Sequence, residues 1–111
     1  MSDLPIEVDV QSVKQMLDSE EGLFLLDCRE PNEFEFAKID GATLIPMGEI
    51  TGRVEELSQF EDKRMVVMCH LGGRSLRVTH WLRNNGFPHA QNMTGGIEAW
   101  SLEIDPDIPR Y

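Results

Sequence analysis

The sequence predicts an α/β fold in which a central parallel sheet is flanked by helices on both faces. Strand-like apolar runs alternate with segments of helical spacing along most of the 111 residues, and this alternation is typical of parallel α/β domains. The runs at residues 23–26 and 65–68 are continuously apolar, as expected for strands buried on both faces. The length suits a single domain over residues 1–111.

The first half of the chain predicts three strands, each with a helical segment after it. Residues 6–8 suit a short edge strand, and Asp9 is placed to cap the following helix. After the strand at residues 23–26, Pro31 fits the first turn of a short helix. A third strand is predicted at residues 43–45, and apolar residues recur at helical spacing over residues 47–60.

The second half contains the most regular predicted strand, residues 64–68, followed by a short loop and a helix over residues 76–83. Gly86 suits the left-handed position that ends this helix. A short strand at residues 90–93 and a helical turn at residues 97–100 complete the prediction. Ligands of such sheets bind beyond the carboxyl ends of the strands, so the functional residues are expected at that edge.

Composition excludes several classes of function. A net charge of -10 disfavours nucleic acid and anionic membrane as partners. Residues 1–5 show no basic leader, and no apolar run is long enough to span a bilayer, so we expect a cytoplasmic protein. Cys28 and Cys69 are then expected to be free thiols. Two cysteines without a CxxC motif and three scattered histidines predict no metal site.

The charges are segregated along the chain. Residues 1–62 hold sixteen acidic and four basic residues, whereas residues 63–97 hold five basic residues and no acidic one. Folding can mix these charges in space, or the acid-free stretch can keep a local positive field. We expect the positive field, because the acid-free stretch contains the loop most suited to bind an anion.

That loop runs from Cys69 to Ser75, between the predicted strand and helix. A cysteine is nucleophilic as its thiolate, and a helix N-terminus and the nearby Arg74 both favour negative charge. Gly72 and Gly73 allow successive backbone N–H groups to point inward. Ser75 can cap the helix or donate its hydroxyl. The alternative is a buried structural cysteine before an ordinary glycine turn.

Three motifs, in order, resemble the single-domain rhodanese family of sulfurtransferases from about residue 8 to residue 100. The motifs are LLDCRE at 25–30 with Glu33-Phe34 and IDGATLIP at 39–46, then CHLGGRS at 69–75, and GGIEAW at 95–100. One departure is Lys38, which stands where the family often has histidine. The resemblance implies a rhodanese-like fold.

The resemblance also implies a reaction. Cys69 would attack the outer sulfur of thiosulfate or a persulfide donor, and the resulting Cys69 persulfide would pass its sulfur to cyanide in an assay or to a thiol or protein acceptor in the cell. Arg74 would orient an anionic donor. No metal or organic cofactor is required. The residues expected to bind the donor and the persulfide are His70, Leu71, Gly72, Gly73, Arg74 and Ser75.

Two other functions are open to this fold. The resemblance also extends to dual-specificity phosphatases of the cell-cycle type, which share this fold. Those enzymes place five residues between cysteine and arginine. Here four residues separate Cys69 from Arg74, which makes a tighter cup suited to one sulfur atom. Rhodanese-like domains also serve as interaction or regulatory modules, usually without the cysteine, and a sulfur carrier is a further variant.

The remaining candidates are supporting residues. Asp27 and Arg29 resemble the family's paired charges beside the active loop and are expected to form a salt bridge, with direct donor binding by Arg29 as the alternative. Cys28 is expected to be a small core residue, although a resolving thiol is the other interpretation. His70 is placed at the rim, where it could touch donor or acceptor or act as a general base.

Overall fold

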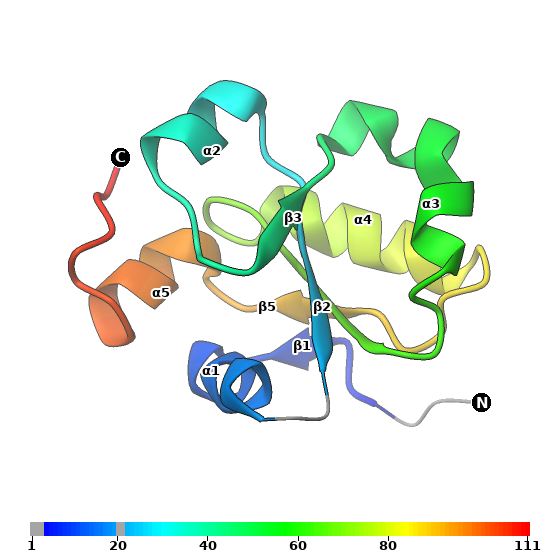
Figure 1. The fold of residues 1–111 in the computed structure, drawn as a ribbon, viewed down its shortest axis with the longest axis horizontal. Coiled ribbons are helices and arrows are strands. Elements are labelled where there is room, and N and C mark those ends of the chain that lie inside the picture. The colour runs from blue at the N-terminus through cyan, green and yellow to red at the C-terminus, as the bar shows by residue number, and fades with distance from the viewer. Residues whose placement is uncertain (1–3, 20–21) are drawn as a thin grey trace.

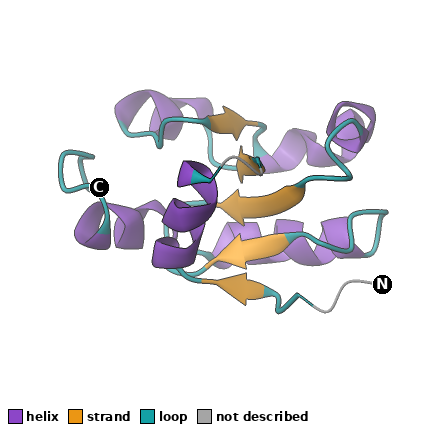
Figure 2. Ribbon diagram, turned by 60° about the horizontal axis from the view of Figure 1, so that its bottom comes forward, coloured by secondary structure: helices purple, strands orange, loops and turns teal. Residues whose placement is uncertain are grey.

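A computed structural model describes residues 4–19 and 22–111 of the chain. Its centre is a five-stranded sheet in the order β1-β5-β4-β2-β3 with every pairing parallel, and the large arrows of Figure 2 point the same way. The predicted parallel α/β fold is confirmed. The strands are β1 (Glu7–Val8), β2 (Leu23–Asp27), β3 (Ala42–Leu44), β4 (Arg64–Met68) and β5 (Gln91–Met93).

Helices cover both faces of the sheet (Figures 1 and 2). One face packs against α1 (Val10–Asp18) and α5 (Gly96–Glu103), and the other against η1 (Met47–Arg53), α3 (Val54–Ser58) and α4 (Gly73–Arg83). The short helix α2 (Pro31–Phe36) follows the carboxyl end of β2. Both faces of the sheet are buried, because successive side chains of the central strands enter opposite hydrophobic cores.

The capping residues predicted from the sequence lie at the observed ends of two helices. Asp9 caps α1, where its Oδ1 accepts the Ser12 N–H at 2.8 Å. Gly86 adopts the left-handed φ of 100° after α4. The segment 47–60 differs from the prediction, because it begins as the 3₁₀ helix η1 and becomes α-helical only in α3. Gly48 and Gly52 lie within η1, and glycine disfavours a regular α-helix.

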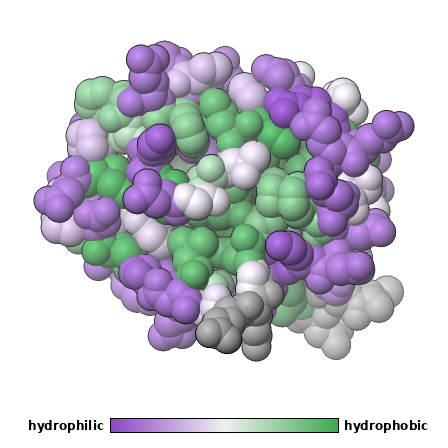
Figure 3. Space-filling model, in the orientation of Figure 1, coloured by the Kyte–Doolittle hydropathy of each residue, from purple (hydrophilic) through white to green (hydrophobic). Residues whose placement is uncertain are grey.

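One face of the molecule carries a continuous patch of hydrophobic side chains (Figure 3). In Figure 3 hydrophobic side chains gather near the middle of one face, between α1, α2 and α5, and hydrophilic side chains surround them. No helix within residues 4–19 and 22–111 has the length and apolar character to cross a bilayer. Residues 1–3, on which the expected absence of a leader partly depends, lie outside the described residues.

Candidate active site

Cys69 follows the last residue of β4, and its sulfur lies at the N-terminus of α4. The Sγ atom accepts the Gly72 N–H at 3.1 Å and the Ser75 N–H at 3.4 Å, and the Ser75 hydroxyl lies 3.3 Å away. Only 1% of the residue is exposed. Two backbone N–H donors directed at one buried sulfur stabilise negative charge on it, and the helix N-terminus adds its own positive potential.

The N-termini of α4 and α5 both contact the loop that follows Cys69, and they hold its backbone in this conformation. Gly72 precedes α4 with a left-handed φ of 112°, which glycine adopts without strain. On the opposite side, α5 begins under the loop, where the Ile97 and Glu98 N–H groups donate to the carbonyls of Cys69 and His70 at 2.9 and 3.1 Å. A Cβ atom on Gly96 would lie 2.4 Å from both of these carbonyl oxygens. The family-like GGIEAW motif therefore supports the backbone of the cysteine loop.

Ser75 belongs to a buried polar network and does not cap the helix. Gly72 occupies the N-cap position of α4, and the Ser75 hydroxyl lies between Cys69 Sγ and the Oδ1 atom of Asn92 on β5. The Asn92 Nδ2 group donates to the Gly72 carbonyl at 3.2 Å and to Glu7 Oε1 at 3.0 Å. Because both Nδ2 partners are acceptors, the amide orientation is defined and its oxygen faces Ser75.

Arg74 does not stand as a free cation beside the loop. Its Nη1 and Nη2 atoms donate to Oε1 and Oε2 of Glu33 on α2 at 2.7 and 2.9 Å. This bidentate hydrogen bonding with Arg74 lowers the pKa of the Glu33 carboxyl to about 2. The expected local positive field is therefore wrong at this position, because folding brings an acid from the first half of the chain onto the loop arginine.

The expected salt bridge between Asp27 and Arg29 is present and fully buried, with Nη2 2.7 Å from Oδ2. Arg29 also donates to the Ala37 carbonyl at 2.6 Å and to the Tyr111 hydroxyl at 3.0 Å. The Tyr111 ring stacks on His70, with ring centroids 3.9 Å apart. Arg29 thus supports the rim of the site through Tyr111, and its guanidinium is enclosed by protein groups.

Cys28 lies beside Cys69 but in a different environment. Asp27 pairs with Met68 across β2 and β4, so the next residues are neighbours, and both cysteines belong to the same core cluster. The Cys28 Sγ atom faces the Met68 carbonyl at 3.5 Å. Burial, followed by the nearby charges of Cys69 and Asp27, raises the pKa of the Cys28 thiol to about 12.

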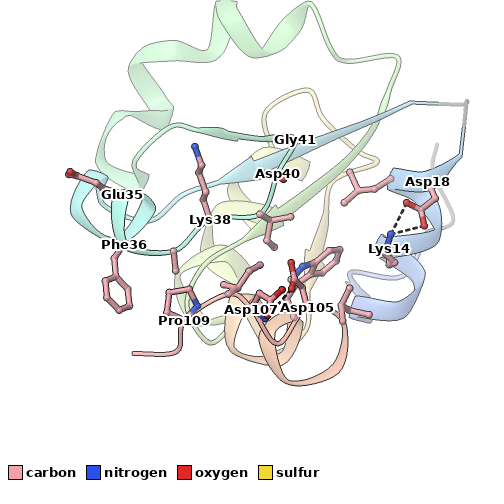
Figure 4. Close-up of a pocket in the computed structure, with 16 residues that line it drawn as sticks. Lys14, Asp18, Glu35, Phe36, Lys38, Asp40, Gly41, Asp105, Asp107 and Pro109 are labelled. Atoms are coloured by element: carbon pink, nitrogen blue, oxygen red, sulfur yellow. Dashed lines mark hydrogen bonds and ion pairs between the residues drawn. The ribbon is translucent and has the colours of Figure 1, made fainter.

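A wide hollow on the α1 and α5 face lies away from this site (Figure 4). Charged side chains such as Lys14, Asp18 and Asp105 border it together with the apolar Phe36 and Pro109, and none of residues 69–75 lines it. Lys14 and Asp18 pair with each other at 2.8 Å. Among the described residues, no group of three or more histidine, cysteine or acidic side chains is arranged to hold a metal.

Three residues that the structure brings to the site are not among the candidates predicted from the sequence. Glu33 was part of a motif but had no assigned role, although it pairs with Arg74. Asn92 is a polar residue inside a predicted strand, a signal that could have marked it. Tyr111 carried no signal, because its position depends on where the segment after α5 runs.

The comparisons with known proteins agree with this geometry. The sequence profile of the family described as "Rhodanese-like domain" matches residues 9–103. The chain belongs to the rhodanese-like domain family. A solved structure of a rhodanese-like domain protein from Staphylococcus aureus superposes with a TM-score of 0.77 at 27% identity, covering 95% of this chain and 97% of that one.

Curated rhodanese-like relatives connect the family with sulfur transfer. The putative sulfurtransferase YtwF of Bacillus subtilis is 35% identical over 90% of this chain and 94% of its own length. The putative sulfur carrier protein YrkF of the same organism is 36% identical over 86% of this chain and 50% of its own length. This chain spans half or less of the length of the first curated relatives it matches. The rhodanese-like chain is thus similar to sulfurtransferases and sulfur carriers.

Proposed function

We propose that this protein is a sulfurtransferase that carries a sulfane sulfur on Cys69. The observation behind the proposal is the pair of backbone N–H donors, from Gly72 and Ser75, that point at a single sulfur atom at the N-terminus of α4. Such a cup stabilises the anionic sulfur of a thiolate and, by small adjustment, the terminal sulfur of a persulfide. The cysteine is present and cradled, which favours chemistry over a purely binding role.

The reaction proceeds in two displacements. The Cys69 thiolate attacks the outer sulfur of thiosulfate or of a persulfide donor, the donor's S–S bond breaks, and its electron pair leaves with sulfite or with the donor thiolate. An acceptor nucleophile such as cyanide or a thiolate then attacks the outer sulfur of the Cys69 persulfide, and the Cys69 thiolate returns. Covalent catalysis of this kind divides one transfer into two easier steps.

The rest of the loop has supporting roles in this proposal. The N–H groups of residues 70–75 surround the transferred sulfur, His70 and Leu71 form the rim, and the Asp27–Arg29 salt bridge maintains the neighbouring strand end. Cys28 stays a protonated core thiol. The acceptor is a thiol, free or on a partner protein, and the neutral backbone cup requires no cofactor.

The deciding experiment is intact-protein mass spectrometry after incubation with thiosulfate. The wild-type protein should gain the mass of one sulfur atom and lose it on addition of cyanide, with release of thiocyanate. Cys69→Ser should gain nothing, whereas the matched control Cys28→Ser should behave as wild type. An adduct that persists in Cys69→Ser would contradict the proposal.

Turnover separates an enzyme from a carrier. A sulfurtransferase should form many thiocyanate molecules per protein, whereas a carrier would stop near one. Hydrolysis of p-nitrophenyl phosphate by the same preparation, lost in Cys69→Ser, would instead favour the phosphatase alternative. We expect repeated turnover of sulfur. We also expect no phosphate release, because four residues between Cys69 and Arg74 leave a cup the size of a single sulfur.

A further inference from the structure

The positive charge of Arg74 is neutralised by the adjacent carboxylate of Glu33. Arg74 and Glu33 form two parallel hydrogen bonds of 2.7 and 2.9 Å, the arrangement in which a guanidinium binds a carboxylate most strongly. The Glu33 side chain is only 15% exposed, so the pair is partly shielded from water and salt. An approaching anion therefore meets a neutral pair at this side of the loop.

Glu33 is also held in place independently of Arg74. Its Oε1 atom accepts the Glu30 N–H at 3.1 Å in the capping box of α2, and its Oε2 atom accepts the Tyr111 hydroxyl at 2.7 Å. Tyr111 is in turn bound by Arg29, which is fixed by Asp27. A donor anion that drew Arg74 away would leave this fixed carboxylate without its cation, which costs free energy.

The remaining surroundings of the site do not replace the missing positive charge. Arg29, the other cation of this cluster, is bound by Asp27. Leu71 and Phe36 are exposed apolar side chains at or beside the rim, and Tyr111 adds an exposed aromatic ring. The chain carries a net charge of -10. The positive potential comes from the N–H groups around Cys69, which act over a short range and suit the charge of one sulfur.

We propose that Glu33 is a donor-specificity residue that neutralises Arg74, so that the site selects sulfane sulfur carried on an uncharged organic group over the dianion thiosulfate. The proposal rests on the function proposed above and names the donor class: alkyl persulfides and thiosulfonates. With an alkyl persulfide, the Cys69 thiolate takes the outer sulfur and the donor leaves as its thiolate. With methanethiosulfonate, the same attack breaks the S–S bond and methanesulfinate leaves with the electron pair.

Methanethiosulfonate and thiosulfate make a matched pair of probes. Both present an outer sulfur on a sulfonyl sulfur, but a methyl group in the first replaces a charged oxygen in the second, so the charges are one and two. Their intrinsic reactivities differ, and the informative quantity is the ratio of their kcat/KM values, compared between variants. A guanidinium freed from its carboxylate attracts the dianion by one charge more, worth about tenfold at a partly screened distance of about 6 Å.

Glu33→Gln is the decisive variant, since the amide oxygen can still accept the Glu30 N–H. We expect it to raise the thiosulfate to methanethiosulfonate ratio of kcat/KM about tenfold at low ionic strength, with a smaller gain at high salt. Glu35→Gln removes the same charge from the same helix without touching Arg74, and its ratio should match wild type. Adding Arg74→Gln to Glu33→Gln should abolish the gain.

The outcomes separate the two proposals. An unchanged ratio in Glu33→Gln, or an equal rise in Glu35→Gln, would overturn the role of Glu33 while leaving sulfur transfer intact. A gain that survives in the double variant would overturn it too, because the gain must act through Arg74. Failure of both donors to load sulfur on wild-type Cys69 would instead reject the proposed function itself.

Discussion

Cys69 and Cys28 occupy equivalent places in the sheet, each one residue beyond the end of a central strand, β4 for one and β2 for the other. Both are essentially buried, with exposures of 1% and 0%. Their surroundings are opposite. Cys69 Sγ accepts two backbone N–H groups, whereas Cys28 Sγ faces a carbonyl oxygen and has its pKa raised to about 12 by burial.

The difference shows that burial does not decide which thiol is reactive. Burial in an apolar core disfavours the charged form of a thiol, and donors directed at the sulfur offset that penalty. After β4 the chain enters a glycine loop and a helix N-terminus, so its backbone N–H groups point at the sulfur. After β2 the chain enters a buried salt bridge, and the ladder continues with the Cys28 N–H bound to the Met68 carbonyl at 3.1 Å.

The largest expected effect is the difference in alkylation between the two thiols. At pH 8 a thiol whose pKa is about 12 is thiolate in a fraction on the order of 10⁻⁴. Iodoacetamide should therefore label Cys69 much faster than Cys28, as measured by mass spectrometry of the two peptides over time. In urea both should react at similar rates. Comparable labelling of the two thiols in the native protein would contradict the proposed difference in their reactivity.

The second effect concerns the support that Cys69 has from α5. Gly96→Ala would place a methyl group 2.4 Å from the carbonyl oxygens of Cys69 and His70, at a φ of 58°. We expect the variant to lose roughly 3 to 5 kcal/mol of unfolding free energy in urea titrations.

Gly73 is the matched control for Gly96. A Cβ atom on Gly73 meets nothing within 4 Å, and Gly73→Ala keeps the backbone N–H. The control should remain within about 1 kcal/mol of wild type or gain stability as a helix residue. Equal losses in the two variants would show that the α5 junction has no special part in holding the cysteine loop.

The smallest expected effect is on kcat/KM and concerns the Ser75 hydroxyl. Ser75→Ala removes the hydroxyl that lies 3.3 Å from Cys69 Sγ but keeps the backbone N–H. The single hydroxyl proton also faces Asn92 Oδ1, so kcat/KM for sulfur transfer should fall by no more than about tenfold, less than the loss of a full hydrogen bond to a charged group. Ser101→Ala is the control, because this buried hydroxyl donates to the Ile108 carbonyl and is expected to leave the rate per folded protein unchanged. If both variants kept the wild-type rate, the Ser75 hydroxyl would have no part in stabilising the sulfur.

The fold class and the position of the cysteine cup follow from local patterns in the sequence. The apolar runs at residues 23–26 and 65–68 predict buried parallel strands, and both are observed within β2 and β4. The cup is equally predictable, because strand, Cys69, glycine loop and helix are contiguous and the atoms that reach the sulfur lie within six residues of it. Backbone hydrogen bonds between residues close in sequence can therefore be predicted from the sequence of that segment.

The tertiary structure alone decided the partners of the charged and polar side chains. The Glu33 carboxylate meets Arg74 across 41 positions of sequence separation, Asn92 meets Ser75 across 17, and Tyr111 comes to lie on His70. A charged side chain pairs with an opposite charge that the packing of helices brings close to it. The choice of partner therefore depends on how α2, α4 and the segment after α5 are arranged in space. For this reason the acid-free run in the sequence did not become a free positive charge beside Cys69.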